Sequence, residues 1–367
     1  MRTELWRHFD FWLLGSVAIL TILGIAMINS AIAGNEELID QTSRQIVFAV
    51  SGFLILLITA AIDYRLWTAI GRFMYIGITV LLGLTFLIGG TQLGVVRWLD
   101  VGLVLIQPSE IAKIALILVL AEFFARNQAR IHDLRWVFRS LLLTLGMVFW
   151  IFIQPNLSTS IVLLVIWLAL LWATGLQAKH LILFGVAAVI VAAVSFPLLQ
   201  DYQQQRVLTF LFPDPEARFG ANYNVNQALI TIGSGGLFGQ GYQQGNQVQL
   251  RFLKVRHTDF IFSALAEEFG FVGTIVVLAL ILFVIWRILR AARLARDTYG
   301  ALIAYGVATL IFFHTTVNIA MNINIIPVTG LPLPFLSSGG SALISTLMGV
   351  GLVESVLLRQ KTLEFQT

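Results

Sequence analysis

The sequence predicts an all-α integral membrane protein, with about ten transmembrane helices and one long extracytoplasmic loop between spans 7 and 8. The composition, the recurring apolar runs and the placement of basic residues carry this prediction. Of the 367 residues, 58% are hydrophobic and 11% are charged, and the mean hydropathy is +0.88. Soluble domains carry about 25% charged residues. We therefore expect a single polytopic membrane domain over residues 1–367.

Long apolar runs recur to the end of the chain. A spanning helix needs about 20 mostly apolar residues, and the expected spans are roughly 9–33, 44–62, 66–90, 108–125, 137–154, 158–175, 180–199, 261–286, 300–325 and 337–358. The first run ends in "SAIAG" and could pass for a signal peptide, but it is long enough to span the bilayer. The region 200–260 is polar and glycine-rich and has room for short helices of its own.

The basic residues give the orientation. Most of the 23 Lys and Arg residues lie in short loops on the side of the N-terminus, whereas the short loops on the other side hold Arg44 and Arg97. The excess of positive charge marks the cytoplasmic side, so both termini are expected in the cytoplasm and the long loop outside. No basic face or stripe is present, which argues against nucleic acid as a partner.

The first segment that carries chemistry is "RWLDVGLVLIQPSEIAK", from Arg97 to Lys113. Glu110 and Lys113 are three residues apart on one helix face and can pair. Ionisable residues at membrane depth are costly and usually face the bundle interior or water. Two interpretations stay open: an internal salt bridge that fixes helix packing, or part of a substrate site.

The second segment, "VNQALITIGSGGLFGQGYQQGNQ", contains Gly235 and Gly236 among six glycines that permit close backbone approach. A dinucleotide-binding motif is a poor interpretation, because no parallel-sheet context surrounds it and it faces away from the cytosol.

Directly after the glycines, "KVRHTDF" leads back into the membrane. Lys254, Arg256, His257 and Thr258 put cations and hydrogen-bond donors beside Asp259. An acid at this position is either a helix cap or a general base in a polar loop over the membrane.

Two further segments break the helical pattern. "QPNLSTS", from Gln154 to Ser160, is expected to form a turn in which Asn156 caps the next helix. "NINIIPVTGLPLPFLSSGGSA" is apolar but rich in proline and glycine, and ends in Ser337, Ser338, Gly339 and Gly340. Such backbone is tolerated near a membrane when it is buried in protein or lines a cavity. It forms either a re-entrant cavity wall or a tight extracellular cap.

Together these segments resemble the SEDS family of bacterial cell-wall polymerases. The resemblance covers nearly the whole chain and rests on "RWLDVG…QPSEIAK", "GSGGLFGQGY", "RHTDFIFSALAEEFG" and "PVTGLPLPFLSSGGS", in this order. "RHTDFIF" and "GLPLP" are closer to the elongation-associated branch than to the division-associated branch, in which "GLTLP" is usual.

The resemblance implies a peptidoglycan glycosyltransferase in the bacterial cytoplasmic membrane that joins lipid II units at the outer face during cell elongation. Asp259 falls on the family's essential aspartate, which is proposed to deprotonate the acceptor hydroxyl. The substrate site would draw on Arg97, Glu110, Lys113, Gly235, Gly236, Lys254, Arg256, His257, Thr258, Ser337, Ser338, Gly339 and Gly340.

Partners and cofactors follow from the same resemblance. The expected partner is a class B penicillin-binding protein, a transpeptidase that activates the polymerase. The sequence shows no dedicated metal cage, and a divalent cation, Mg or Mn, would be shared with the substrate diphosphate.

Two departures from the family pattern stand out. Asn156 replaces an aspartate that is usual in "QPDLGT", so an ionic or metal role is in doubt there. Ser338 replaces the tyrosine of "SYGGS".

Two alternatives to the enzyme remain: a lipid II flippase without chemistry, and a non-enzymatic scaffold of the cell-wall complex. A transporter should place polar residues on both sides of the midplane, whereas in this sequence they are expected to gather on the outer half.

Overall fold

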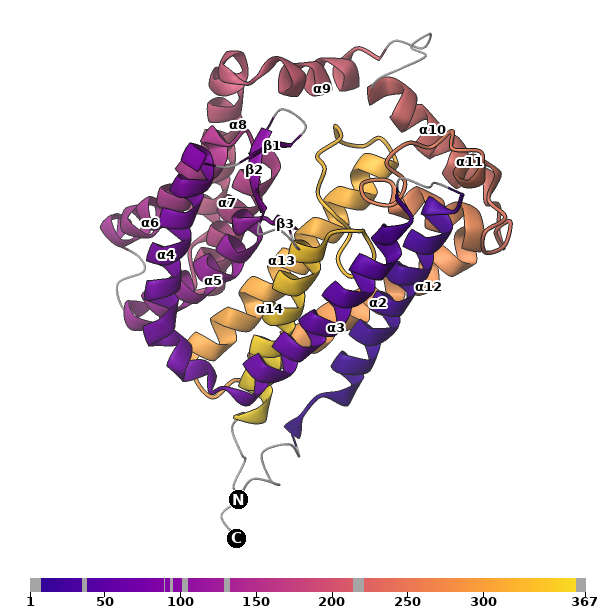
Figure 1. Ribbon diagram of the computed structural model, residues 1–367. Helices are drawn as coiled ribbons and strands as arrows, with labels where there is room; N and C mark the ends of the chain where they lie inside the picture. The colour runs from indigo at the N-terminus through magenta and orange to yellow at the C-terminus, as the bar shows by residue number, and fades with distance from the viewer. Residues whose placement is uncertain are drawn as a thin grey trace.

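The computed structural model describes residues 8–34, 38–88, 90–92, 95–100, 105–128, 133–213 and 221–360. Within them the chain is a helical bundle (Figure 1). A helix lies in each of the ten expected spans: α2 (Phe11–Ile32), α3 (Asp40–Ala61), α4 (Trp67–Ile88), α5 (Pro108–Arg126), α6 (Leu134–Ile153), α7 (Leu157–Ala173), α8 (Ala178–Ser195), α12 (Ile261–Leu294), α13 (Thr298–Asn322) and α14 (Gly340–Leu358).

The structure therefore confirms an all-α, multi-pass membrane architecture. By length and composition, seven of the described helical segments could cross a membrane. The other three are α5, which carries four charged residues, α7, which has 17 residues, and α8, whose apolar part is Ile182–Ser195. The exact count of ten spans stays a prediction.

Short elements connect these helices: η3 (Tyr64–Leu66), β1 (Gly90–Gln92), β2 (Val95–Asp100), β3 (Leu105–Ile106), η5 (Phe196–Leu198), α9 (Asp201–Leu211), α10 (Ala221–Ser234) and α11 (Asn246–Gln249). The small antiparallel sheet, in the order β1-β2-β3, was not expected from the sequence. The short helices α9, α10 and α11 confirm the expectation for region 200–260.

The bundle has two distinct ends. Figure 1 shows the start of α2 and the end of α14 at one end and α9, α10 and α11 at the other. The centre is formed by α5, α13 and α14, whose side chains are mostly buried. Small residues permit the close helix contacts that membrane bundles need: a Cβ on Gly306 would lie 2.7 Å from the side chain of Ile117, and one on Gly351 would overlap Thr59 of α3.

The helix α12 differs from its expected range in two ways. It extends to Leu294 rather than ending near residue 286, and it is interrupted at Gly270, where φ is +67° and ψ is −169°. Glycine adopts such a left-handed conformation without the steric cost of a Cβ. The part of α12 before Gly270 therefore packs against the long loop, while the part after it continues to Leu294.

Candidate functional site

The segment between α13 and α14 (residues 323–339, the α13–α14 segment) is the centre on which the sequence motifs converge. It is irregular in backbone and buried over most of its second half. The hydroxyl of Ser337 donates to the carbonyl of Thr258 at 2.8 Å, and the amide of Ser338 donates to the carbonyl of His257 at 2.9 Å. The two motifs that the sequence marked separately are thus joined by direct hydrogen bonds.

Asp259 lies at the start of α12, against this segment. Its main-chain carbonyl accepts hydrogen bonds from the side-chain amides of Asn318 at 3.2 Å and Asn322 at 3.0 Å. Its Oδ2 atom lies 3.8 Å from the position that a Cβ would take on Gly330. The backbone on both sides of the carboxylate is therefore fixed, while the side chain itself is half-buried.

Burial raises the pKa of Asp259, because a carboxylate loses hydration there, and the positive charge of Arg206 opposes that rise. Burial and the neighbouring charge of Arg256 lower the pKa of His257. A carboxylate with a raised pKa is a stronger base once it is deprotonated, as general-base catalysis requires.

The "QPNLSTS" segment also reaches the α13–α14 segment. The side chain of Asn156 accepts from the amide of Thr159 at 3.3 Å, which confirms the expected cap on α7. Two residues further on, the hydroxyl of Ser158 donates to the carbonyl of Thr329 at 2.6 Å. Asn156 has a structural partner that needs only an oxygen acceptor, so replacement of the family's aspartate leaves the turn intact.

Glu110 and Lys113 form the buried pair that their spacing predicted. The Lys113 ammonium lies 2.8 Å from Oε2 of Glu110, and the side chains are 2% and 6% exposed, respectively. The ammonium also lies 3.3 Å from Nε2 of His314, whose Nδ1 lies 3.3 Å from the carbonyl of Pro332. Through His314, which the sequence reading missed, the pair is connected to the α13–α14 segment.

The far end of the α13–α14 segment rests on α3. The amide of Gln41 donates to the hydroxyl of Ser338 at 2.9 Å, and Gln45 accepts from the backbone of Gly339 at 3.3 Å. Gly340 lies against Phe48, and a Cβ on it would overlap the aromatic ring. The serines and glycines of this motif therefore fix backbone here, and their contact with substrate stays a prediction.

The glycine-rich segment (residues 233–245) packs on α12 at its interruption. A Cβ on Gly235 would lie 2.0 Å from the carbonyl oxygen of Ala266, whereas one on Gly236 meets nothing within 4 Å. Backbone hydrogen bonds join this segment to α12: the amide of Gln240 donates to the carbonyl of Glu267 at 2.9 Å, and the amide of Phe271 donates to the carbonyl of Gly236 at 2.9 Å. The close packing of Gly235 explains why glycine stands there, and a role in binding substrate is untested.

Two adjacent glutamates of α12, Glu267 and Glu268, are buried within protein. Glu267 accepts hydrogen bonds from the amides of Gln247 at 2.8 Å and Val248 at 3.1 Å, which begin α11. Glu268 accepts from the hydroxyl of Ser30 on α2. These carboxylates hold the long loop and α2 to α12.

The predicted cations are placed differently from one another. Arg256 is buried and donates to the carbonyls of Ala31 and Leu253, so it closes the end of α2. Lys254 is exposed, with its ammonium 5.9 Å from the ring centre of Tyr223 on α10. Arg97 lies on β2, and its side chain is outside the part that the structure describes. Of the three, Lys254 is the one whose charge the described structure leaves at the surface.

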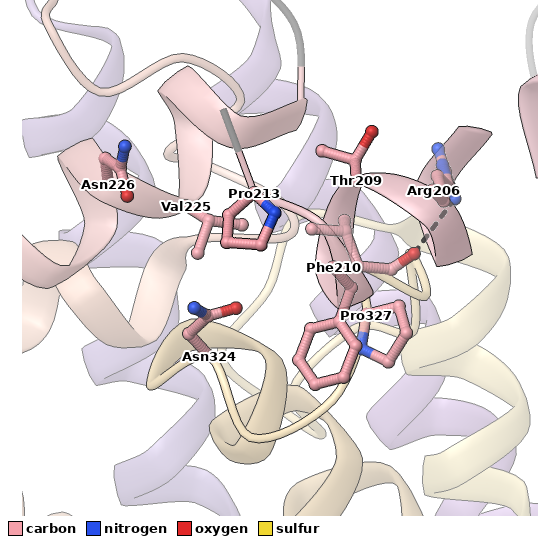
Figure 2. Close-up of a pocket in the computed structure, with 9 residues that line it drawn as sticks. Arg206, Thr209, Phe210, Pro213, Val225, Asn226, Asn324 and Pro327 are labelled. Atoms are coloured by element: carbon pink, nitrogen blue, oxygen red, sulfur yellow. Dashed lines mark hydrogen bonds between the residues drawn. The ribbon is translucent and has the colours of Figure 1, made fainter. Parts of the chain in front are cut away.

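A further cation, not singled out from the sequence, lies against the same α13–α14 segment as Asp259. Arg206, on α9, donates from Nη1 to the carbonyl of Val328 at 3.3 Å. It lines a small cavity of about 30 Å³ between α9, α10 and the α13–α14 segment (Figure 2). Only the fold could reveal this residue, because more than 50 residues separate it from Asp259 in the chain.

A resident metal centre is not supported by the described residues. None of their His, Asp and Glu side chains form a group of three or more that could hold a metal ion, and the chain has no cysteine.

Buried charge is also present at the opposite end of the bundle. Arg287 pairs with Asp10, whose backbone amide donates to Glu354 at 3.0 Å. The expectation that polar residues gather on the outer half is therefore wrong: this cluster joins α2, α12 and α14 near the termini. It was missed because its members are distant in sequence.

Comparisons with known proteins agree with this fold. The model of the cell cycle protein family FtsW, RodA and SpoVE matches residues 10–362. The peptidoglycan glycosyltransferase MrdB of Escherichia coli K12 is 39% identical over 360 residues, which cover 97% of this chain and 95% of that protein. A probable peptidoglycan glycosyltransferase FtsW of Geobacter sp. M18 is 32% identical, with coverage of 96% and 98%.

Solved structures give the same result. A chain from a study of the structural coordination of polymerization and crosslinking by a peptidoglycan synthase complex superposes with a TM-score of 0.80 at 30% identity, covering 95% of this chain and 97% of that one. The rod shape determining protein RodA of Thermus thermophilus gives a TM-score of 0.72 at 30% identity, with coverage of 96% and 98%.

The fold and the converging motifs define a polytopic membrane protein of the cell-wall synthesis class. The chain belongs to the FtsW, RodA and SpoVE family, as its sequence motifs had indicated.

Proposed function

We propose that this chain polymerises lipid II into glycan strands, with Asp259 as the general base that deprotonates the acceptor sugar hydroxyl. The observation that carries the proposal is the position of Asp259: its half-buried carboxylate faces the α13–α14 segment, which the "QPNLSTS" segment contacts directly and the Glu110–Lys113 pair contacts through His314. The glycosyltransferase activity itself accords with the names of relatives 39% and 32% identical to this chain.

The chemistry asks for two functions at one place. A base must take the proton of the acceptor hydroxyl as its oxygen attacks the anomeric carbon, and the leaving undecaprenyl diphosphate must be stabilised. Asp259 supplies the first function. Lys254, on the same loop, is a cation for the second, and the apolar bundle faces suit an undecaprenyl chain.

We place the active end outside the cytoplasmic membrane, with both termini in the cytoplasm. The basic residues of the short loops and the separation of the termini from α9, α10 and α11 support this orientation (Figure 1). A class B penicillin-binding protein transpeptidase is the proposed partner, since a structural neighbour comes from a synthase complex that coordinates polymerization and crosslinking. A Mg or Mn ion would arrive with the substrate diphosphate.

A flippase for lipid II is the second candidate, and the buried cluster of Asp10, Arg287 and Glu354 at the opposite end favours it more than the sequence did. A transporter needs polar groups on both sides of the midplane. Arg287 and Asp10, however, form an ion pair, and Oε2 of Glu354 accepts from the backbone amide of Asp10, as a structural cluster would show. A non-enzymatic scaffold predicts neither polymer nor translocation.

The test is polymerisation of lipid II by the purified chain with its transpeptidase partner. We expect Asp259→Ala and Asp259→Asn to abolish polymer formation, because neither side chain can accept the proton. Asp201→Asn, on an exposed carboxylate of α9, is the matched control and should retain activity. Melting temperatures check folding, because loss of a polar contact at a helix start costs about 1 kcal/mol. Full activity of Asp259→Ala would contradict the role of Asp259 as the general base. Translocation of lipid II without polymer formation would establish the flippase.

A further inference from the structure

The helix α9 is seated over the protein by specific polar contacts. The hydroxyl of Tyr202 donates to the carbonyl of Pro155 at 2.8 Å, and the amide of Gln203 donates to the same carbonyl at 3.3 Å. Pro155 lies directly before the cap of α7. These contacts hold the first turn of α9 next to the "QPNLSTS" segment, at the end of the bundle that also holds α10 and α11.

One turn further along, Arg206 is held from two sides. Its guanidinium carbon lies 5.7 Å from the ring centre of Tyr202, within cation–π range, and its Nη1 donates to the carbonyl of Val328. Val328 is two residues from Gly330, the residue that faces the carboxylate of Asp259. Arg206 and Asp259 therefore approach the same short stretch of the α13–α14 segment.

We propose that Arg206 is a positioning residue for the transfer reaction: its guanidinium, fixed on the Val328 carbonyl, places a cation beside the Asp259 carboxylate and seats α9 on the α13–α14 segment. The inference rests on the proposed role of Asp259 as base. It assigns α9 a part in catalysis rather than treating it as a connection between spans.

The charge environment of Asp259 makes this role specific. On its own stretch of chain, Lys254 lies against the ring of Tyr223 and Arg256 is directed to the carbonyl of Ala31, while burial and Arg256 keep the pKa of His257 low. From α13 it meets the neutral amides of Asn318 and Asn322. The α13–α14 segment contains no titratable side chain, and α7 contributes the hydroxyl of Ser158. Arg206 is therefore the cation whose charge opposes the effect of burial on this carboxylate.

Removal of the charge has a directional consequence. Without Arg206, burial acts unopposed and the pKa of Asp259 rises further. The base form is present only above that pKa, so the acid limb of the pH–rate profile should move to higher pH. Activity at the acid end should fall by a larger factor than activity at the alkaline end, where Asp259 is deprotonated in either protein.

The experiment compares rates of lipid II polymerisation from about pH 5 to about pH 9 for the complex with its transpeptidase. Arg206→Met keeps a long stem without charge, Arg206→Lys restores a cation, and Arg290→Met, on an exposed arginine of α12 at the other end, is the control. We expect the acid limb of Arg206→Met to move to higher pH, that of Arg206→Lys to move back toward wild type, and Arg290→Met to match wild type.

An equal loss of activity at every pH, with the acid limb unmoved, would overturn the role of Arg206 even if Asp259→Ala is inactive. Activity of Asp259→Ala across the pH range would instead overturn the base on which the inference rests. The two failures are thus distinguishable. Melting temperatures of the complexes separate a displaced α9 from a changed titration, since unfolding does not by itself move an acid limb.

Discussion

His314 shows how one side chain connects a buried ion pair to an irregular segment. Its Nδ1 can only donate to the carbonyl of Pro332, which is an acceptor, so Nε2 is left as the acceptor for the ammonium of Lys113. The neutral tautomer with the proton on Nδ1 satisfies both contacts. The Lys113 ammonium then has two acceptors, since it also bonds Glu110, and this makes its burial tolerable.

Three substitutions of His314 separate its two contacts. His314→Phe removes both, and we expect it to lower the free energy of unfolding by about 1–3 kcal/mol, because Lys113 and the Pro332 carbonyl each lose a buried partner. His314→Asn can still donate to Pro332, and His314→Gln can still reach Lys113, so each should lose less. Thermal unfolding of the detergent-solubilised protein measures the series. Equal melting temperatures for wild type and His314→Phe would contradict the connection.

At the same scale, the sequence predicted the pairs that local spacing determines and missed those that the fold creates. Glu110 and Lys113 lie three residues apart on one helix, so their pairing follows from helical geometry. Arg206 reaches the α13–α14 segment, against which Asp259 lies, only because Tyr202 and Gln203 hold α9 on Pro155. Nothing in the local sequence around either residue encodes that approach, which is why Arg206 was absent from the predicted site.

At the scale of elements, the glycine-rich segment and the interruption of α12 form one unit. Further along the segment, the backbone amides of Gln240 and Gly241 donate to the carbonyls of Glu267 and Glu268 at 2.9 and 3.0 Å. The interruption at Gly270 exposes those carbonyls to the loop rather than to the next helical turn. The sequence showed the glycines and the apolar run, but not that one packs on a break in the other.

Two neighbouring glycines test this unit. A Cβ on Gly235 would lie 2.0 Å from the carbonyl oxygen of Ala266, so Gly235→Ala must displace the segment from α12. Gly233→Ala is the matched control, because a Cβ there meets nothing within 4 Å and alanine favours helix α10 by roughly 0.5–1 kcal/mol. We expect Gly235→Ala to lose polymerase activity and lower the melting temperature, and Gly233→Ala to preserve both. Matching behaviour of the two variants would contradict the close packing.

Apolar runs alone predicted the helices of the bundle, since a hydrophobic stretch of sufficient length has few alternatives in a bilayer. The small sheet β1-β2-β3 escaped prediction because its strands are two to six residues long and lie between two spans. The sequence predicted that each helix exists more reliably than it predicted the residues at which the helix begins and ends. α12 runs on to Leu294, past Arg287, whose side chain pairs with Asp10.

At the scale of the whole molecule, the bundle has one end fastened by charge and one end built around Asp259. The cluster of Asp10, Arg287 and Glu354 ties three helices together beside the termini. At the opposite end, backbone hydrogen bonds join the glycine-rich segment to α12, the Glu267 carboxylate holds α11, and the first turn of α9 contacts Pro155 through neutral side chains. Since a neutral hydrogen bond contributes only about 0.5–1.5 kcal/mol and α9 has no buried residue, α9 is the element at this end better suited to rearrange around a substrate.

The assignment of these ends to the two sides of the membrane can be tested directly, because the chain contains no cysteine. Gln205→Cys places a thiol on the exposed face of α9, and Gln128→Cys places one just after α5, where Gln128 accepts a hydrogen bond from Thr298 at the start of α13. With the long loop outside, a membrane-impermeant maleimide should label Gln205→Cys in intact spheroplasts, while Gln128→Cys should react only after the membrane is permeabilised. The reverse pattern would put Asp259 in the cytoplasm, where the glycan strand could not be delivered to the cell wall. Polymerase activity of both variants serves as the control for native folding. If both variants are active and only Gln205→Cys is labelled from outside, the labelling agrees with the charge distribution of the short loops, and the chemistry occurs on the outer side of the membrane.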